Sequence, residues 1–187
     1  GFCTKMRKIL LTDIDGVVLD WSSHFNNYLR EYHPDKKLMD PTTFAQAPDT
    51  AELIESYNKT AWIGFLEPHK DSKEVLPEIK KAGWTIIGCT SMGTDRYANA
   101  LRKMNIESHF PDVFSKVDII PFMEPKNNWL TYYKDSDAVW VEDKISNAKA
   151  GADVGLNTYL MKHEYNAFLD DKRIKKVDNW RQIANSI

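Results

Sequence analysis

The sequence predicts an α/β fold in which helices cover a doubly wound parallel sheet. Short apolar runs, partly β-branched, alternate along the chain with segments of helical pattern, as in sheets built from βαβ units. Polar or charged residues directly follow several of these runs, and ligands of open α/β sheets bind at the carboxyl ends of strands. With 187 residues, of which 42% are hydrophobic and 28% charged, the chain has the composition of one globular domain with room for a small insert.

The expected strands and helices alternate after the first strand. The strands are Lys8–Thr12, Trp84–Cys89, a weaker run at Val117–Pro121, Ala138–Val141 and Thr158–Met161. The helices between them are Asp71–Ala82, Asp95–Met104, Asn127–Lys134 and Ser146–Asp153. Asp71 and Glu74 have the spacing of a capping box, and Gly83 suits a helix stop, whereas Pro77 fits the interior of that helix poorly.

The segment after the first strand breaks this alternation. It holds helical stretches at Ser22–Tyr32 and Ala51–Tyr57, many aromatic residues and four prolines. An insert that leaves the sheet directly after the first strand would lie over the carboxyl ends of the strands. We therefore expect a core domain made of residues 1–20 and 71–187, with a small helical cap at 21–70.

Composition argues against several classes of protein. The net charge of −2 offers no basic patch for nucleic acid, and no apolar run approaches the roughly 20 residues of a membrane span. Two cysteines, Cys3 and Cys89, do not make a disulfide framework or a metal cluster. These features favour a cytoplasmic protein without nucleic-acid or membrane partners, and they leave the oligomeric state open, a homodimer included.

Two carboxylates, Asp13 and Asp15, directly follow the first expected strand and precede Gly16. Residues at i and i+2 point to the same side of an extended chain, so both carboxylates can face one site. They repel each other unless a cation or a shared proton intervenes, and Mg²⁺ is the hard cation that carboxylates commonly hold beside a phosphate. A polar turn is the alternative, since Asp-Gly is common turn chemistry.

Three further polar positions lie beside expected strand ends. Thr90 and Ser91 can donate hydroxyl groups to a phosphate oxygen, although capping of the next helix is the alternative. Lys126 precedes a helix and is either a functional cation or a solvated charge. Glu142 and Asp143 can complete a cation site, or else favour the dipole of the helix that follows them. Their common placement at one side of the sheet favours a single site.

This order of motifs resembles the haloacid dehalogenase-like superfamily. The resemblance implies that Asp13 is a nucleophile that forms an aspartyl-phosphate, with Asp15 as general acid and base. It also implies that Asp13, Asp143 and the main-chain carbonyl of Asp15 bind Mg²⁺, and that Thr90 and Lys126 hold the phosphate.

Further residues take roles from the same resemblance. Gly16 and Ser91 would contact the phosphate, while Glu142 and Asn147 would support the metal ligands. Dehalogenases of this superfamily lack the second acid of the first motif, so Asp15 points to phosphate chemistry.

A narrower resemblance covers most of the chain and points to the 5′(3′)-deoxyribonucleotidase branch. The segments that carry it are Asp13–Trp21, Trp62–Pro68, Cys89–Ser91, Tyr165–Asn166 and Val177–Trp180. It implies a nucleoside monophosphate as substrate, with Trp21 near the base and Phe25, Trp62 and Phe65 as further aromatic contacts. Packing between cap and core is the alternative for each of these aromatic residues.

These observations together predict a Mg²⁺-dependent phosphomonoesterase whose substrate is a small phosphorylated molecule, a nucleoside monophosphate by resemblance. Two alternatives remain at this level. The core motifs also suit a phosphatase for another phosphorylated metabolite, and the same fold could serve as a catalytically silent binding domain. A phosphatase that processes nucleic-acid ends is disfavoured by the lack of a basic groove.

Overall fold

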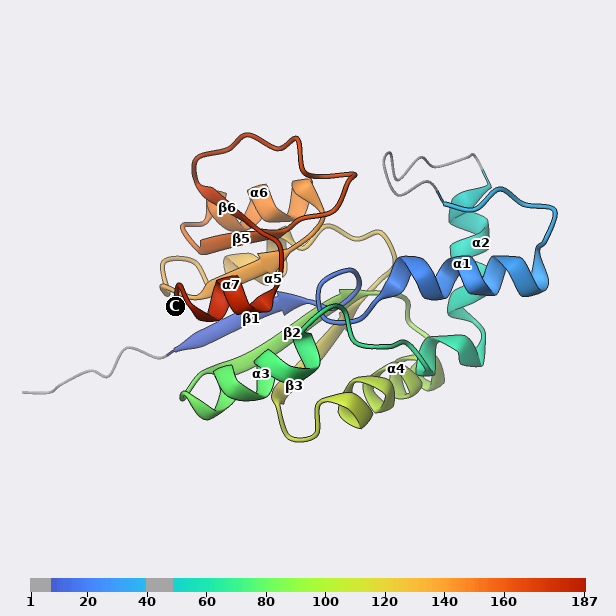
Figure 1. Ribbon diagram of the computed structural model, residues 1–187, viewed down its shortest axis with the longest axis horizontal. Helices are drawn as coiled ribbons and strands as arrows, with labels where there is room; N and C mark the ends of the chain where they lie inside the picture. The colour runs from blue at the N-terminus through green and yellow to red at the C-terminus, as the bar shows by residue number, and fades with distance from the viewer. Residues whose placement is uncertain (1–7, 40–48) are drawn as a thin grey trace, which may run out of the picture.

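The computed structural model describes residues 8–39 and 49–187. Its centre is a parallel sheet of six strands in the order β3-β2-β1-β4-β5-β6 (Figure 1). The strands are β1 (Ile9–Asp13), β2 (Thr85–Ser91), β3 (Phe114–Ile120), β4 (Val139–Glu142), β5 (Asn157–Met161) and β6 (Ile174–Val177). The winding direction reverses between β1 and β4, which pair with each other. The predicted doubly wound, Rossmann-like α/β fold is confirmed, and in such sheets the reversal point is where ligands bind.

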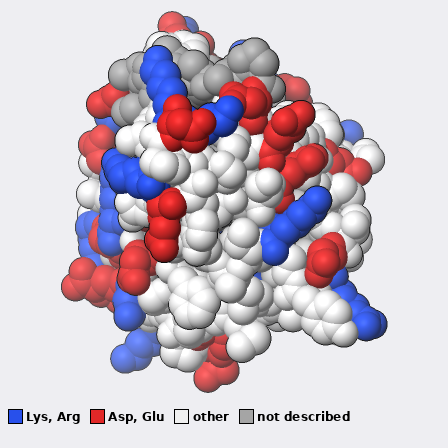
Figure 2. All heavy atoms as spheres, turned by 90° about the vertical axis from the view of Figure 1, so that its right-hand side faces the viewer, with Lys and Arg blue, Asp and Glu red and all other residues white. Residues whose placement is uncertain are grey.

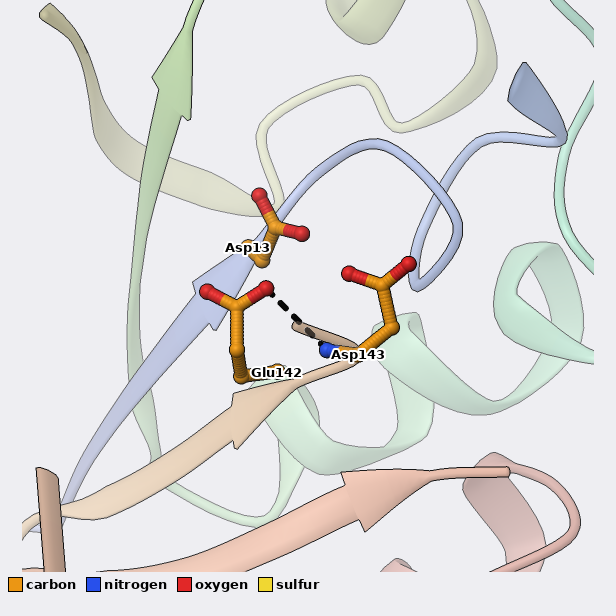
Figure 3. Close-up of side chains that lie close together, drawn as sticks. All are labelled: Asp13, Glu142 and Asp143. Atoms are coloured by element: carbon orange, nitrogen blue, oxygen red, sulfur yellow. Dashed lines mark hydrogen bonds between the residues drawn. The ribbon is translucent and has the colours of Figure 1, made fainter. Parts of the chain in front are cut away.

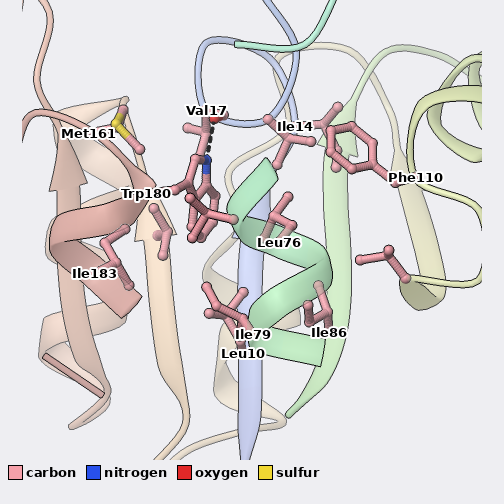
Figure 4. Packing of buried hydrophobic residues seen from close by; sticks show 14 of the residues in the cluster. Leu10, Ile14, Val17, Leu76, Ile79, Ile86, Phe110, Met161, Trp180 and Ile183 are labelled. Atoms are coloured by element: carbon pink, nitrogen blue, oxygen red, sulfur yellow. Dashed lines mark hydrogen bonds between the residues drawn. The ribbon is translucent and has the colours of Figure 1, made fainter. Parts of the chain in front are cut away.

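Apolar side chains of the sheet pack against helices on both faces, because alternate strand residues point to opposite sides. Leu10 belongs to the cluster under α3, whereas Leu11 belongs to the cluster under α5 and α6. One face is covered by α3 (Ser72–Lys81), α4 (Arg96–His109) and α7 (Trp180–Ala184), and the other by α5 (Asn127–Thr131) and α6 (Ile145–Asp153). On the first face the buried Trp180 donates its indole N–H to the carbonyl of Val17 at 2.8 Å (Figure 4).

Some details of the helices and strands differ from the expectation. The edge strand β6 was missed because its two central residues are exposed lysines, which interrupt the apolar run, and α7 was missed because it is only five residues long. The helix α3 continues through Pro77, in agreement with its expected range, since Val75, Leu76 and Ile79 bury its apolar face against the sheet. The helix α5 ends at Thr131, earlier than its expected end at Lys134.

The end of β2 also differs in a way that bears on function. Thr90 and Ser91 are strand residues, and α4 begins only after Asp95. The Asp95 carboxylate caps that helix by accepting the N–H groups of Tyr97 and Ala98 at 2.8 and 3.0 Å. The hydroxyls of Thr90 and Ser91 therefore do not cap α4, which excludes helix capping as the role of these two residues.

The segment after β1 forms a helical cap over the carboxyl ends of the strands (Figure 1). Its helices are α1 (Trp21–Tyr32), α2 (Thr50–Asn58) and the 3-10 helix η1 (Ala61–Gly64). Residues 40–48 of this segment lie outside the described residues. The cap leaves and rejoins the core at one place, because Asp20 donates its N–H to the carbonyl of Glu67 and His69 donates its N–H to the carbonyl of Val18, both at 2.8 Å.

The cap has a buried cluster of its own, which includes Phe25, Leu29 and Tyr57. It also packs on the core, since a Cβ atom at Gly64 in η1 would lie 2.7 Å from Cγ of Leu101 in α4. Figure 2 shows the molecule from the cap end, where a broad uncharged area runs down the middle and acidic and basic side chains are mixed around it. Among the described helices, none is long and apolar enough to cross a membrane.

Candidate active site

Three carboxylates meet at the reversal point of the sheet. Asp13 ends β1, Glu142 ends the neighbouring strand β4, and Asp143 follows it (Figure 3). One carboxylate oxygen from each residue lies within 4.8 Å of the others. Asp13 is 6% exposed and Glu142 1% exposed, so the cluster is largely shielded from water. The carboxyl ends of adjacent parallel strands place these acids together although they are far apart in the sequence.

Lys126 lies inside this cluster. It is 2% exposed, and its Nζ donates to Oδ1 of Asp13 at 2.6 Å and to Oε2 of Glu142 at 3.0 Å. Burial lowers the pKa of this ammonium group, but the charges of Asp13 and Glu142 outweigh burial and hold the pKa above its ordinary value. Lys126 is therefore a buried, permanently charged partner of the acids, which excludes the solvated surface charge that a lone lysine suggested.

One lysine does not balance three carboxylates. Burial would raise the pKa of Asp13, but Lys126 and the hydrogen bonds around it lower that pKa below its ordinary value. Burial and the charge of Asp13 raise the pKa of Glu142 to about 7, and burial with the charges of Asp13 and Glu142 raises the pKa of Asp143 well above its ordinary value. Without a cation, Glu142 and Asp143 therefore tend to retain protons, which a hard divalent cation such as Mg²⁺ would replace, and the oxygen-only donor set fits such a cation.

Gly16 lies against the third acid. A Cβ atom at Gly16 would come within 2.3 Å of Oδ2 of Asp143, and its φ of +78° is unfavourable for other residues. Its N–H donates to the carbonyl of Leu19 at 2.9 Å. With its N–H used in this way, Gly16 lets Asp143 approach, and the expected phosphate contact of Gly16 stays a prediction.

Asp15 faces the cavity from the loop after β1, where two residues hold its carboxylate. Thr90 donates its hydroxyl to Oδ2 of Asp15 at 3.3 Å, and the guanidinium group of Arg102 in α4 forms an ion pair with Oδ1. Arg102 is only 2% exposed. Sequence reasoning missed it, because an arginine within an amphipathic helix is normally a solvated charge.

A cavity of about 440 Å³ connects the acidic cluster to the cap. Its lining includes most of the predicted site residues, namely Asp13, Asp15, Gly16, Trp21, Thr90, Ser91, Lys126, Glu142, Asp143 and Asn147. It also includes residues that sequence reasoning did not select, among them Ile54, Asn58, Phe122, Met123 and Tyr165. Ile54 and Asn58 come from the cap helix α2, so that the cap closes one side of the cavity.

Three of the four predicted aromatic contacts do not line the cavity. Phe25 is fully buried inside the cap, and Trp62 packs against His24 with ring centroids 5.2 Å apart. Phe65 is 67% exposed outside the cavity. Trp21 does line it, and its ring stacks on Phe25 at 4.7 Å. Packing in the cap thus accounts for Phe25 and Trp62, in agreement with the alternative, whereas Phe65 is exposed to solvent.

Two polar residues lie near the site with different partners from those expected. Ser91 donates its hydroxyl to the carbonyl of Pro121 at 3.0 Å and accepts the N–H of Met123 at 2.8 Å, so it braces the loop after β3. Asn147 accepts the main-chain N–H of Lys126 at 3.2 Å. It therefore supports the lysine segment, whereas it was expected to orient Asp143.

The fold is shared with solved structures of haloacid dehalogenase-like proteins. A candidate phosphatase from Clostridium difficile has a TM-score of 0.70 and 18% identity, covering 98% of this chain and 99% of that one. An L-2-haloacid dehalogenase gives a TM-score of 0.62 and 13% identity over 97% and 99% of the two chains. A D,D-heptose 1,7-bisphosphate phosphatase from B. bronchiseptica, solved with magnesium and phosphate, gives 0.60 and 12% over 96% and 99%. The chain therefore shares the fold of these phosphatases and of this dehalogenase.

The similarity in sequence covers less of the chain than the similarity in structure does. No family model matches the chain. An uncharacterized 32.4 kDa protein from the Gp30-rIII intergenic region of Enterobacteria phage T4 is 30% identical over 124 residues. This match covers 60% of the chain and 44% of the phage protein, so the chain spans less than half the length of that relative.

Proposed function

We propose that this protein is a Mg²⁺-dependent phosphomonoesterase that forms an aspartyl-phosphate on Asp13 and acts on nucleoside monophosphates. The observation that carries the proposal is the convergence of Asp13, Asp15, Lys126 and Asp143 on one cavity under the cap. The fold is one that phosphatases and dehalogenases share. A second acid at Asp15 favours the phosphatases, because the departure of an alkoxide needs a proton donor.

The chemistry of the proposal follows from the contacts of Asp13 and Asp15. Lys126 donates to Oδ1 of Asp13, so we assign Oδ2 as the oxygen that attacks phosphorus while the bond to the leaving oxygen breaks. Asp15 gives its proton to the leaving alkoxide. It then accepts a proton from the water that attacks the aspartyl-phosphate, which releases inorganic phosphate and restores Asp13.

The metal and the cations around it have separate tasks in this scheme. Asp13, Asp143 and the main-chain carbonyl of Asp15 would hold Mg²⁺, which supplies positive charge beside the transferred phosphoryl group. Lys126 neutralises Asp13 and Glu142, so that a phosphate dianion can approach the acidic cluster. The ion pair with Arg102 fixes the position of the Asp15 carboxylate.

The apolar part of the cavity lining supports a substrate with a flat, apolar portion. Trp21, Ile54, Phe122 and Met123 line it, together with the amide of Asn58. A volume of about 440 Å³ lies within the usual range for small-molecule sites. Aromatic stacking of the Trp21 type contributes about 1–3 kcal/mol per nucleobase in single-strand binders and tolerates any base. These features favour a nucleotide over a sugar phosphate.

Hydrolysis assays test both levels of the proposal. We expect the protein to hydrolyse an aryl phosphate with Mg²⁺ and to stop when a chelator removes the metal. On a panel of phosphorylated metabolites, nucleoside monophosphates should have the highest kcat/KM. If no phosphate ester were hydrolysed in the presence of Mg²⁺, a catalytically silent binding domain would be favoured. If the protein hydrolysed phosphate esters without a preference for nucleotides, the phosphatase activity would stand and the assignment of the substrate would be wrong.

Asp15→Asn should slow poor leaving groups more than good ones. Without a proton donor, we expect a fall of about 10²-fold or more in kcat for an alkyl phosphate, since general acid catalysis contributes about 10²–10⁴-fold. A 4-nitrophenyl phosphate, whose leaving group needs little protonation, should lose clearly less. Steady-state kinetics on both esters measures the difference. Equal losses of kcat on both esters would show that Asp15 is not the proton donor and only helps to orient the site.

Trp21→Ala should reduce selectivity for nucleotides. Loss of stacking worth about 1–3 kcal/mol lowers kcat/KM for a nucleoside monophosphate by roughly 5–150-fold, while a small aryl phosphate should be little affected. Phe65→Ala is the matched control, because Phe65 is an exposed aromatic residue of the same cap that does not line the cavity. Equal losses on both substrates for Trp21→Ala would assign Trp21 to packing.

A further inference from the structure

The loop between β5 and β6 contacts both strand ends that build the acidic cluster. We propose that this loop is the positioning element of the metal site and that Tyr165 fixes the orientation of the Asp143 carboxylate. The inference rests on the proposed Mg²⁺ site. It assigns a role to residues that the proposed function does not use.

Asp143 is held by the loop at two points. The hydroxyl of Tyr165 donates to Oδ2 of Asp143, and the amide of Asn166 donates to the main-chain carbonyl of Asp143 at 2.8 Å. Because Tyr165 already holds Oδ2 of Asp143, Oδ1 can bind a cation without a further loss of rotational freedom of this carboxylate. Without the hydroxyl, binding of the cation would also have to order this side chain, and the affinity would fall.

The same loop reaches the segment after β1. The ring of His163 stacks on the ring of Tyr165, with centroids 4.8 Å apart and an interplanar angle of 9°. Its Nε2 donates to the carbonyl of Gly16 at 2.6 Å. Gly16 directly follows Asp15, whose main-chain carbonyl we assign as a ligand. His163 and Tyr165 therefore join the two halves of the metal site through one stacked pair of rings.

The loop is rigid enough for this task. Asn166 is fully buried and donates to the carbonyl of Met161 at 3.0 Å while its Oδ1 accepts the N–H of His163 at 2.8 Å. Lys162 donates its N–H to the carbonyl of Val177 in β6 at 2.8 Å. Because these bonds already order the loop in the protein, Tyr165 is presented to Asp143 at little additional entropic cost.

Tyr165→Phe tests the inference, since it removes the hydroxyl but keeps the ring that stacks on His163. We expect Mg²⁺ to bind the full-length, metal-free variant about 10-fold more weakly than the wild type, as measured by isothermal titration calorimetry. Tyr132→Phe is the matched control, because Tyr132 is 85% exposed and should leave the affinity unchanged. At saturating Mg²⁺, Tyr165→Phe should regain most of the wild-type turnover of an aryl phosphate.

The outcomes separate this inference from the proposed function. Equal Mg²⁺ affinity in Tyr165→Phe and the wild type would overturn the positioning role, and the phosphatase would stand. A loss of turnover that persists at saturating Mg²⁺ with unchanged affinity would overturn it as well. A wild-type protein that binds no Mg²⁺ would remove the inference and the proposed function together.

Discussion

Asp13→Asn is expected to abolish turnover while the protein stays folded. The amide cannot attack phosphorus, so no aspartyl-phosphate forms, and loss of a nucleophile typically costs at least about 10³-fold in kcat. Acid quenching during turnover followed by mass spectrometry measures the intermediate directly. The wild type should carry one phosphoryl group on the peptide that contains Asp13, and the variant should carry none.

Asp112→Asn provides the control for this substitution. Asp112 is an exposed acid of the turn between α4 and β3, at the amino end of β3, so the same change of charge there should leave turnover and phosphorylation as in the wild type. If Asp13→Asn kept more than about a tenth of the wild-type rate, or if the phosphoryl group appeared on another residue, Asp13 would not be the nucleophile. Circular dichroism of the variant excludes loss of the fold as the cause.

Lys126→Met is expected to lose both activity and stability. Asp13 and Glu142 would remain buried without their cation, and breaking a buried ion pair from one side costs about 3–5 kcal/mol. For a chain of this size that corresponds to a fall of roughly 6–20 °C in the unfolding midpoint in the presence of a chelator. Mg²⁺ should recover part of this loss, because it would offset the same carboxylates. Loss of the lysine should also lower kcat by about 10²-fold or more.

Thermal unfolding and kinetics with and without Mg²⁺ measure these effects. Lys73→Met is the matched control, since it changes the same side chain at an exposed position of α3 and should leave both the unfolding midpoint and kcat close to those of the wild type. A Lys126→Met protein as stable as this control would show that the carboxylates do not need the lysine. The charge balance that we describe for the cluster would then be wrong.

Much of the fold could be predicted because the central strands are buried on both faces. The strand β4 is entirely buried, and its residues before the terminal Glu142 are all apolar, which the sequence displays directly. The edge strand β6 has two exposed lysines between its buried ends, and the short α7 is too brief for a periodic pattern. The helix around Pro77 was predicted within Asp71–Ala82 and is present, because tertiary burial of α3 outweighs the loss of one backbone hydrogen bond.

The same distinction separates the site residues that could be predicted from those that could not. Residues fixed by a strand end, such as Asp13 and Glu142, could be predicted because parallel neighbours bring their carboxyl ends together. Arg102 and Tyr165 could not be assigned roles, because their contacts with Asp15 and Asp143 depend on how a helix and a loop pack against the sheet. Phe65 shows the same limit, since the sequence does not reveal which face of the cap an aromatic residue occupies.

A crystal structure of the protein with Mg²⁺ and trifluoroberyllate, which mimics a phosphoryl group on a carboxylate, tests the central claim most directly. The account predicts beryllium bonded to a carboxylate oxygen of Asp13, with Mg²⁺ bound by Asp13, Asp143 and the main-chain carbonyl of Asp15. The fluoride atoms should lie within hydrogen-bond distance of Lys126. Beryllium bonded to another residue, or Mg²⁺ bound away from Asp13 and Asp143, would contradict it.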